Sequence, residues 1–253
     1  MIYDLQKASM WKRISAFLFD GILVSILAVF FAWGISAALH VDRYQAAVQG
    51  AYEKYGAQYG INMQMDFEEY ESLTEEGLLA LENAYAAMNG DMDAVRAQHM
   101  MIYTGLITVS LGILLAFLLW EFLIPLRLGN GQTLGKKIFG LGLMRQDGVK
   151  IRPLALFVRT ILGKYTIETM IPVLLILMIL MNSIGIVGPI VILLILLLEG
   201  LLLLFTRNHT ALHDLMACTV EIDAASQMIF DTPEDLLEYK KKIQAEKAAR
   251  EAY

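Results

Sequence analysis

The sequence predicts an all-α, polytopic membrane protein with four transmembrane helices. The chain has 253 residues, of which 57% are hydrophobic and 18% are charged, whereas soluble domains are usually about 45–50% apolar. The apolar residues gather in long blocks rather than alternating with polar ones, and about 20 of them in a row can cross a bilayer as a helix. The single cysteine, Cys218, excludes an internal disulfide framework.

Residues 1–39 are expected to form an interfacial segment and the first span, residues 14–39. This block is longer than the apolar region of a secretory signal, which favours a retained helix. Within it lies one carboxylate, Asp20, and a charge at that depth marks a candidate functional site. Arg13 precedes it by seven residues, nearly two helical turns, so both side chains project from one face of the helix.

Residues 40–100 are predicted to form an acidic, extracytoplasmic insertion of two or three short helices. The stretch 40–99 holds eleven acidic and three basic residues, with breaks at Gly56, Gly60 and residues 89–91. Its acids lack the spacing and the glycine of a calcium-binding EF-hand loop, so we expect no metal there. The helix that begins near Asp91 is expected to continue into the second span.

Residues 101–128 contain the second span. Glu121 lies near its end, and two interpretations stay open: an interfacial ion pair with Arg127, or a buried functional carboxylate.

Residues 129–153 are predicted to form a basic cytoplasmic elbow. From Arg127 to Lys164 the chain carries eight basic residues and one acidic residue, so the positive-inside rule places this segment, and both termini, in the cytoplasm. Thr133 is expected to cap a short helix, and Asp147–Gly148 to turn a short β-hairpin. Such a basic surface suits anionic lipid headgroups better than nucleic acid. The glycines at 129–135 lack phosphate-loop spacing, which excludes nucleotide binding.

Residues 154–206 should contain an amphipathic interfacial segment (153–170), a third span (171–181), a tight reversal (182–189) and a fourth span (190–205). One long crossing through Gly185 and Pro189 is the alternative, and it would place the C-terminus outside. Residues 207–253 are expected to be cytoplasmic and to end in a charged helix that Thr232 caps. His209 and His213 share a helix face there, but an isolated pair at this spacing does not predict a metal site.

Four motifs together resemble the RDD family of membrane proteins: residues 13–20, 131–140, 144–148 and 213–219. The resemblance implies that Arg13, Asp20 and Asp214 are the family's arginine and two aspartates. It also implies a bacterial plasma-membrane protein with a proposed part in transport, some members being sodium–proton antiporters. The insertion and the last thirty residues lie outside the family pattern. Cys218 stands where the family usually has glycine, which puts the backbone there in question.

Two functions remain open. In the first, Asp20 and Asp214 with Arg13 as counter-ion exchange protons for a cation or small ligand, which for four spans requires a homo-oligomer. In the second, the three residues form a packing network in a membrane scaffold or assembly factor. Glu121, His213 and Glu199 are secondary candidates for the site. We expect no enzyme activity, metal or cofactor.

Overall fold

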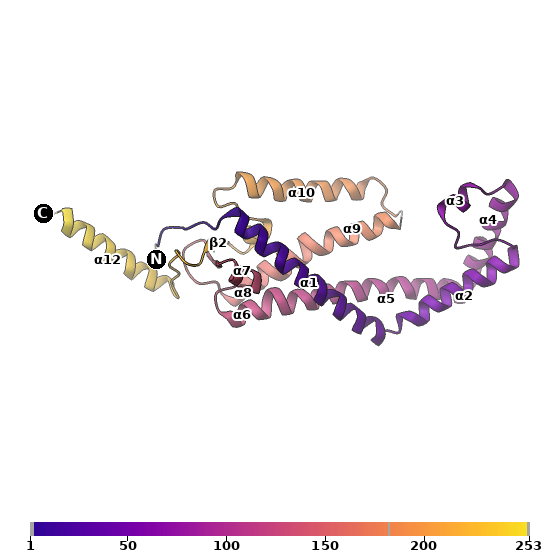
Figure 1. The fold of residues 1–253 in the computed structure, drawn as a ribbon, viewed down its shortest axis with the longest axis horizontal. Helices are drawn as coiled ribbons and strands as arrows, with labels where there is room; N and C mark the ends of the chain where they lie inside the picture. Colours follow the sequence, from indigo (N-terminus) through magenta and orange to yellow (C-terminus); the bar gives the residue numbers. More distant parts are fainter. Residues whose placement is uncertain (1–2, 182, 252–253) are drawn as a thin grey trace. The chain divides into compact units, whose positions relative to one another are not determined.

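A computed structural model describes residues 3–181 and 183–251 (Figure 1). The chain divides into two compact units, one formed by residues 1–28 and 113–253 and the other by residues 29–112. Within the described residues, four helices are long and apolar enough to cross a membrane, and this confirms the predicted class. These spans are Met10–Ala38, Met92–Leu128, Pro153–Leu180 and Val187–Phe205.

The first two spans are longer than their apolar blocks. Helix α1 covers Met10–Ala38, and it begins before Arg13. The second span runs continuously from α5 (Met92–Phe117) through a π-helical segment, η1 (Leu118–Leu123), into α6 (Ile124–Leu128). The predicted continuity from Asp91 into this span is confirmed. Wide π-helical turns often occur at functional sites, and η1 contains Glu121.

The third span differs from the prediction. Helix α8 (Pro153–Phe157), the π-helical segment η2 (Val158–Met170) and α9 (Ile171–Leu180) form one continuous helix. The amphipathic part, predicted to enter along the interface, forms one helix with the apolar part that follows it. Its basic residues, Arg159 and Lys164, are buried against acidic groups from other segments.

A tight reversal separates α9 from α10 (Val187–Phe205), as predicted, although residue 182 lies outside the described residues. The two helices pack together at this end, where a Cβ on Gly188 would lie 2.6 Å from Cγ1 of Ile179. This packing requires the chain to fold back, so the alternative of one long crossing through Gly185 is wrong.

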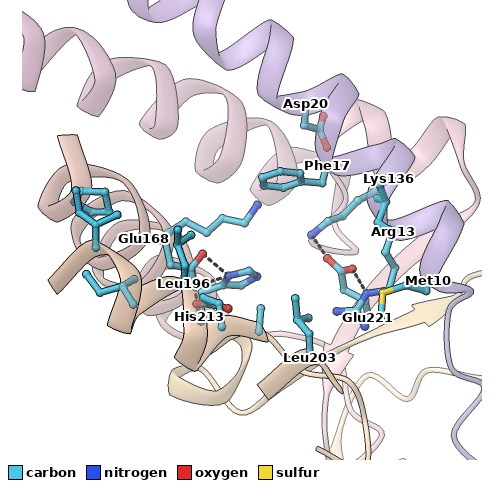
Figure 2. A pocket seen from close by; sticks show the side chains of 17 residues that line it. Met10, Arg13, Phe17, Asp20, Lys136, Glu168, Leu196, Leu203, His213 and Glu221 are labelled. Carbon is cyan, nitrogen blue, oxygen red and sulfur yellow. Dashed lines mark hydrogen bonds and ion pairs between the residues drawn. The ribbon is translucent and has the colours of Figure 1, made fainter. Parts of the chain in front are cut away.

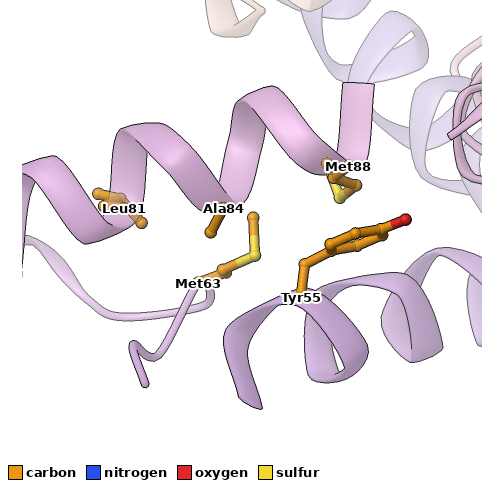
Figure 3. Close-up of a cluster of buried hydrophobic side chains, with 5 residues drawn as sticks. All are labelled: Tyr55, Met63, Leu81, Ala84 and Met88. Carbon is orange, nitrogen blue, oxygen red and sulfur yellow. The ribbon is translucent and has the colours of Figure 1, made fainter. Parts of the chain in front are cut away.

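The insertion contains the predicted short helices: α2 (Val41–Tyr59), α3 (Phe67–Glu71) and α4 (Glu75–Gly90). Helices α3 and α4 are capped by the side chains of Asp66 and Thr74, which accept hydrogen bonds from backbone N–H groups. Five buried side chains form its core (Figure 3): Tyr55, Met63, Leu81, Ala84 and Met88.

The elbow begins with α7 (Leu134–Ile138), which Thr133 caps as predicted. Strand β1 (Leu141–Arg145) follows, and its antiparallel partner is β2 (Thr219–Asp223), with Leu143 opposite Glu221. The predicted hairpin at Asp147–Gly148 is reduced to a turn with one bridge, Met144 to Lys150. The sequence analysis did not predict the pairing with β2, whose Thr219 lies 74 residues after its partner Arg145, because β2 is too short to be recognised in the sequence.

The C-terminal region contains α11 (Leu212–Met216), β2 and α12 (Pro233–Glu251). Thr232 and Asp235 cap α12 reciprocally, each side chain accepting from the other residue's backbone N–H. Cys218, between α11 and β2, has a φ of 51°, in the left-handed region that glycine favours. The chain therefore keeps a glycine-type backbone at this position and bears the associated strain.

Candidate functional site: a buried charge network beside a cavity

Asp20 lies on α1 with 3% of its surface exposed. Its carboxylate accepts hydrogen bonds from Nε1 of Trp120 (2.9 Å), the backbone N–H of Gly135 (2.9 Å) and the hydroxyl of Thr133. The Asp20 side chain packs directly against the backbone of Gly135, because a Cβ on Gly135 would lie 2.7 Å from the Asp20 carboxylate carbon. Both oxygens are thus held by neutral donors, and they join α1 to η1 and to the start of α7.

The expected pair between Arg13 and Asp20 is not formed among the described residues. Nε of Arg13 donates to Oε2 of Glu221 at 2.7 Å, and Nη1 donates to the carbonyl of His209 at 2.6 Å. Nη2 lies 3.8 Å from Oδ2 of Asp214. Two turns of helix separate Arg13 from Asp20, and each has nearer partners: residues 209–221 for Arg13 and residues 120–135 for Asp20.

Arg159, on η2, is the centre of the network and has 1% of its surface exposed. Its Nε donates to Oδ1 of Asp214 at 2.8 Å, and its Nη2 lies 3.1 Å from Oε1 of Glu221. Burial by itself would raise the pKa of the Asp214 carboxyl, but the charge and the hydrogen bond of Arg159 outweigh it and hold that pKa below its usual value. The pKa of Glu221 is likewise lowered, because Lys136, Arg159 and Arg13 outweigh its burial.

Two lysines complete the network. Nζ of Lys136 lies 2.9 Å from Oε1 of Glu221, a close ion pair without hydrogen-bond alignment. Burial, together with the positive charge of Arg159, lowers the pKa of Lys136. Nζ of Lys164 donates to Oε1 of Glu121 at 2.8 Å. Glu121 is therefore a buried carboxylate paired across two spans, and Arg127 is not its partner among the described residues.

His213, on α11, links this network to two further carboxyls. Its Nε2 lies 3.0 Å from Nη2 of Arg159, and a guanidinium can only donate, so Nε2 must accept. The ring is then neutral with its proton on Nδ1, which lies 2.8 Å from the carboxylate oxygens of Glu168. Burial and the charge of Arg159 lower the pKa of His213, consistent with a neutral ring.

Glu168, near the end of η2, accepts a hydrogen bond from the backbone N–H of His213 at 2.9 Å. Glu199 in turn accepts from the backbone N–H of Leu212 at 3.3 Å. Two carboxyls on different spans therefore meet at the start of α11.

A cavity of about 360 Å³ lies beside these groups (Figure 2). Glu168, Glu199 and His213 line one part of it, and Arg13, Lys136 and Glu221 line another. The rest of its wall is mainly apolar: Met10, Ile14, Phe17, Pro172, Ile192, Ile195, Leu196, Leu203 and Ala211.

A sequence model of the RDD family matches residues 7–218. The chain belongs to the RDD family. The match spans most of the chain, and it includes every residue of the network and of the cavity's lining except Glu221. Comparisons with curated proteins and with solved structures give no match.

The RDD signature residues occupy two places in this site. Arg13 and Asp214 lie in the network around Arg159, whereas Asp20 makes a separate set of hydrogen bonds at the cavity's edge. Of the secondary candidates, Glu121 pairs with Lys164 in the network, and His213 and Glu199 lie beside Glu168.

Sequence reasoning missed five residues of the site: Lys136, Arg159, Lys164, Glu168 and Glu221. A signal was present for three of them, since Arg159, Lys164 and Glu168 interrupt an apolar stretch long enough to span a bilayer. Lys136 and Glu221 gave no such signal, because each lies in a short segment with another charge of the same sign, Lys137 and Asp223 respectively. Their burial depends on the pairing of β1 with β2, which places Glu221 opposite Leu143.

Proposed function

We propose that this RDD protein exchanges protons for a cation across the membrane, with Glu168 and Glu199 as the groups that bind both. One observation carries the proposal: two carboxyls from different spanning helices accept from consecutive backbone N–H groups of α11, and both line a cavity. Two negative charges this close favour a state in which the pair holds one proton. Carboxyl groups inside membrane spans are costly and commonly mark ion or proton pathways. A pair that holds one proton can release it when a cation takes its place.

His213 supports the exchange through a hydrogen bond to Glu168. Its neutral ring directs Nδ1–H at Glu168, while Arg159 occupies Nε2. That hydrogen bond orients the Glu168 carboxylate and stabilises its charged form. Protonation of the ring would place a second positive charge against Arg159, so His213 serves as a fixed donor rather than as the exchanging group.

In this proposal the three signature residues, Arg13, Asp20 and Asp214, position the helices. The groups that carry out the exchange are other residues, Glu168 and Glu199. The Asp20 oxygens are held by three donors, so a cation would have to break those bonds to reach them. Glu168 and Glu199 are better placed, since both line the cavity and, among the described residues, neither forms an ion pair with a lysine or arginine.

The test is cation-driven proton flux in proteoliposomes that contain the full chain and a pH-sensitive dye. Glu168→Gln and Glu199→Gln should each abolish the flux while the protein remains folded and monodisperse in detergent. Glu82→Gln, an exposed acid in the insertion, is the matched control and should transport as the unchanged protein does. Flux that persists in both pocket variants would overturn the proposal.

A scaffold or assembly role is the second candidate, and the same structure offers an observation in its favour. All three signature residues have partners inside the protein, as expected of residues whose task is packing. Under this function no cation drives proton flux, and loss of Asp20 or Arg13 reduces only the amount of folded protein. An enzyme role is not part of either proposal.

We place the protein in the plasma membrane with both termini in the cytoplasm. The support is the basic elbow, whose exposed Lys137 and Arg152 are suited to anionic headgroups. Lys136, Arg159 and Lys164 contribute less to that surface than their sequence positions suggest, because they are buried in ion pairs. Four spans are few for a carrier, so we propose a homo-oligomer as the transporting form.

A further inference from the structure

The cavity beside Glu168 and Glu199 is larger than an inorganic ion needs. Its volume of about 360 Å³ falls in the range of sites for small organic ligands. On α10, four of its lining residues, Ile192, Ile195, Leu196 and Leu203, share one face with Glu199 at spacings of three, four and seven residues. The carboxyl of Glu199 thus stands within an apolar stripe that faces the cavity.

The walls of the cavity carry few oxygen ligands for a metal ion. Alkali and alkaline-earth cations require about six oxygen ligands in place of their water, and the greater part of this wall is hydrocarbon. No cluster of three His, Cys, Asp or Glu side chains suited to a metal ion occurs among the described residues. Phe17 presents an aromatic ring at the cavity (Figure 2), a group that attracts organic cations.

The charges around the cavity favour a positive ligand over a negative one. Arg13 and Lys136 are both paired with Glu221, and Lys164 is paired with Glu121. The carboxyls of Glu168 and Glu199 retain net negative charge even with one shared proton. The ionisable groups that face this pair from the surrounding elements are Arg13 and Asp20 of α1, Lys136 of α7, Lys164 of η2, His213 and Asp214 of α11, and Glu221 of β2.

We infer that the cation exchanged at this site is an organic monocation with an apolar body, such as a lipophilic ammonium or phosphonium. Its charge takes the place of the proton between Glu168 and Glu199, and its body lies against Phe17, Leu196 and Leu203. One cation enters and one proton leaves, so the net charge of the occupied site is unchanged. This inference rests on the proposed function and adds the class of substrate.

The experiment is a proton-release measurement on the purified full chain in weakly buffered detergent solution. Tetraphenylphosphonium is the probe, and tetraphenylborate, an anion of similar size and shape, is the control ligand. We expect tetraphenylphosphonium to bind saturably and to release about one proton per protein, because exchange at the pair is one for one. Tetraphenylborate should release none. Glu168→Gln and Glu199→Gln should abolish proton release, and Glu82→Gln should preserve it.

A second variant, Leu196→Trp, keeps both carboxyls but fills the apolar wall one turn from Glu199. It should weaken tetraphenylphosphonium binding at least tenfold. Proton release by sodium or potassium ions, with none by tetraphenylphosphonium, would overturn the substrate class and leave proton–cation exchange standing. Release by neither kind of cation would overturn both. Binding that Leu196→Trp leaves unchanged would contradict the placement of the apolar body.

Discussion

Two regions of this protein are stabilised in opposite ways. The network around Arg159 buries charges against one another, with Asp214 fully inaccessible to solvent. The insertion buries a small apolar core, in which Tyr55, Leu81 and Met88 pack between α2 and α4 (Figure 3). Its ion pair, Lys54 to Asp91 at 3.0 Å, lies at the surface, where such pairs contribute little.

This difference in how the two regions are stabilised indicates what each region is suited for. Apolar packing stabilises a fold with little dependence on which neighbour supplies the contact, whereas a buried charge requires a specific partner at a specific place. The network therefore ties α1, η2, α7, α11 and β2 into one arrangement, and it does so at a cost in desolvation. This desolvation cost is consistent with a functional site. The apolar core of the insertion buries no charges and has no such cost.

The largest expected effect comes from removing the centre of the network. Arg159→Met keeps helix propensity and side-chain bulk but leaves Asp214 and Glu221 without the guanidinium, and breaking a buried pair costs about 3–5 kcal/mol. We expect a severe loss of folded, monodisperse protein and a much lower denaturation temperature in detergent. Arg152→Met, at an exposed arginine seven residues earlier, is the control. Equal denaturation temperatures for the two variants would contradict a central role for Arg159.

A smaller and more local effect is expected in the insertion. Met88 has 4% of its surface exposed and Met92 has 79%, so the two methionines form a matched pair. Met88→Ala should destabilise the insertion by about 2–4 kcal/mol, because burying less apolar surface leaves a cavity. Met92→Ala should cost under about 0.5 kcal/mol. Limited proteolysis with fragment mapping measures this, and cleavage should rise within residues 40–91 of the Met88 variant alone.

The smallest effect concerns mild acid, and it should separate the two regions by pH. His213 has a pKa below its ordinary 6.5, so the unfolded chain takes up this proton first, and the network loses stability as the pH falls below that value. Asp214 and Glu221, whose pKa values are lowered, add a further loss at more acidic pH. Between pH 7 and 5 we therefore expect the denaturation temperature of the protein in detergent to fall.

The insertion is stabilised by an apolar core rather than by buried charges, so proteolysis of the insertion should change less over the same range. The control is His99→Gln, a histidine outside the network, which should leave the pH dependence as it is. If the denaturation temperature of the protein rises as the pH falls from 7 to 5, the conclusion that the His213 ring is neutral in the folded protein is wrong.

Much of the fold was predictable because its signals are local. The spans follow from apolar length, the helix starts at Thr133 and Thr232 from capping side chains, and the insertion's helices from their glycine breaks. The site was predictable in part. The family motifs led to Arg13, Asp20 and Asp214, and the charge in each apolar block led to Glu121 and Glu199. Arg159 was counted as a cytoplasmic charge, although it is the residue that binds Asp214.

The sequence by itself determined that this chain has four membrane-spanning helices, an acidic helical insertion and costly charges within its apolar segments. Only the tertiary structure decided which charges meet. Arg13 pairs with Glu221 rather than with Asp20, and the reason is geometric. Arg13 and Asp20, two helical turns apart, cannot reach each other as well as they reach groups that packing brings in from 100 to 208 residues away. Helix length and capping are properties of neighbouring residues, whereas the pairing of buried charges depends on the packing of the whole unit.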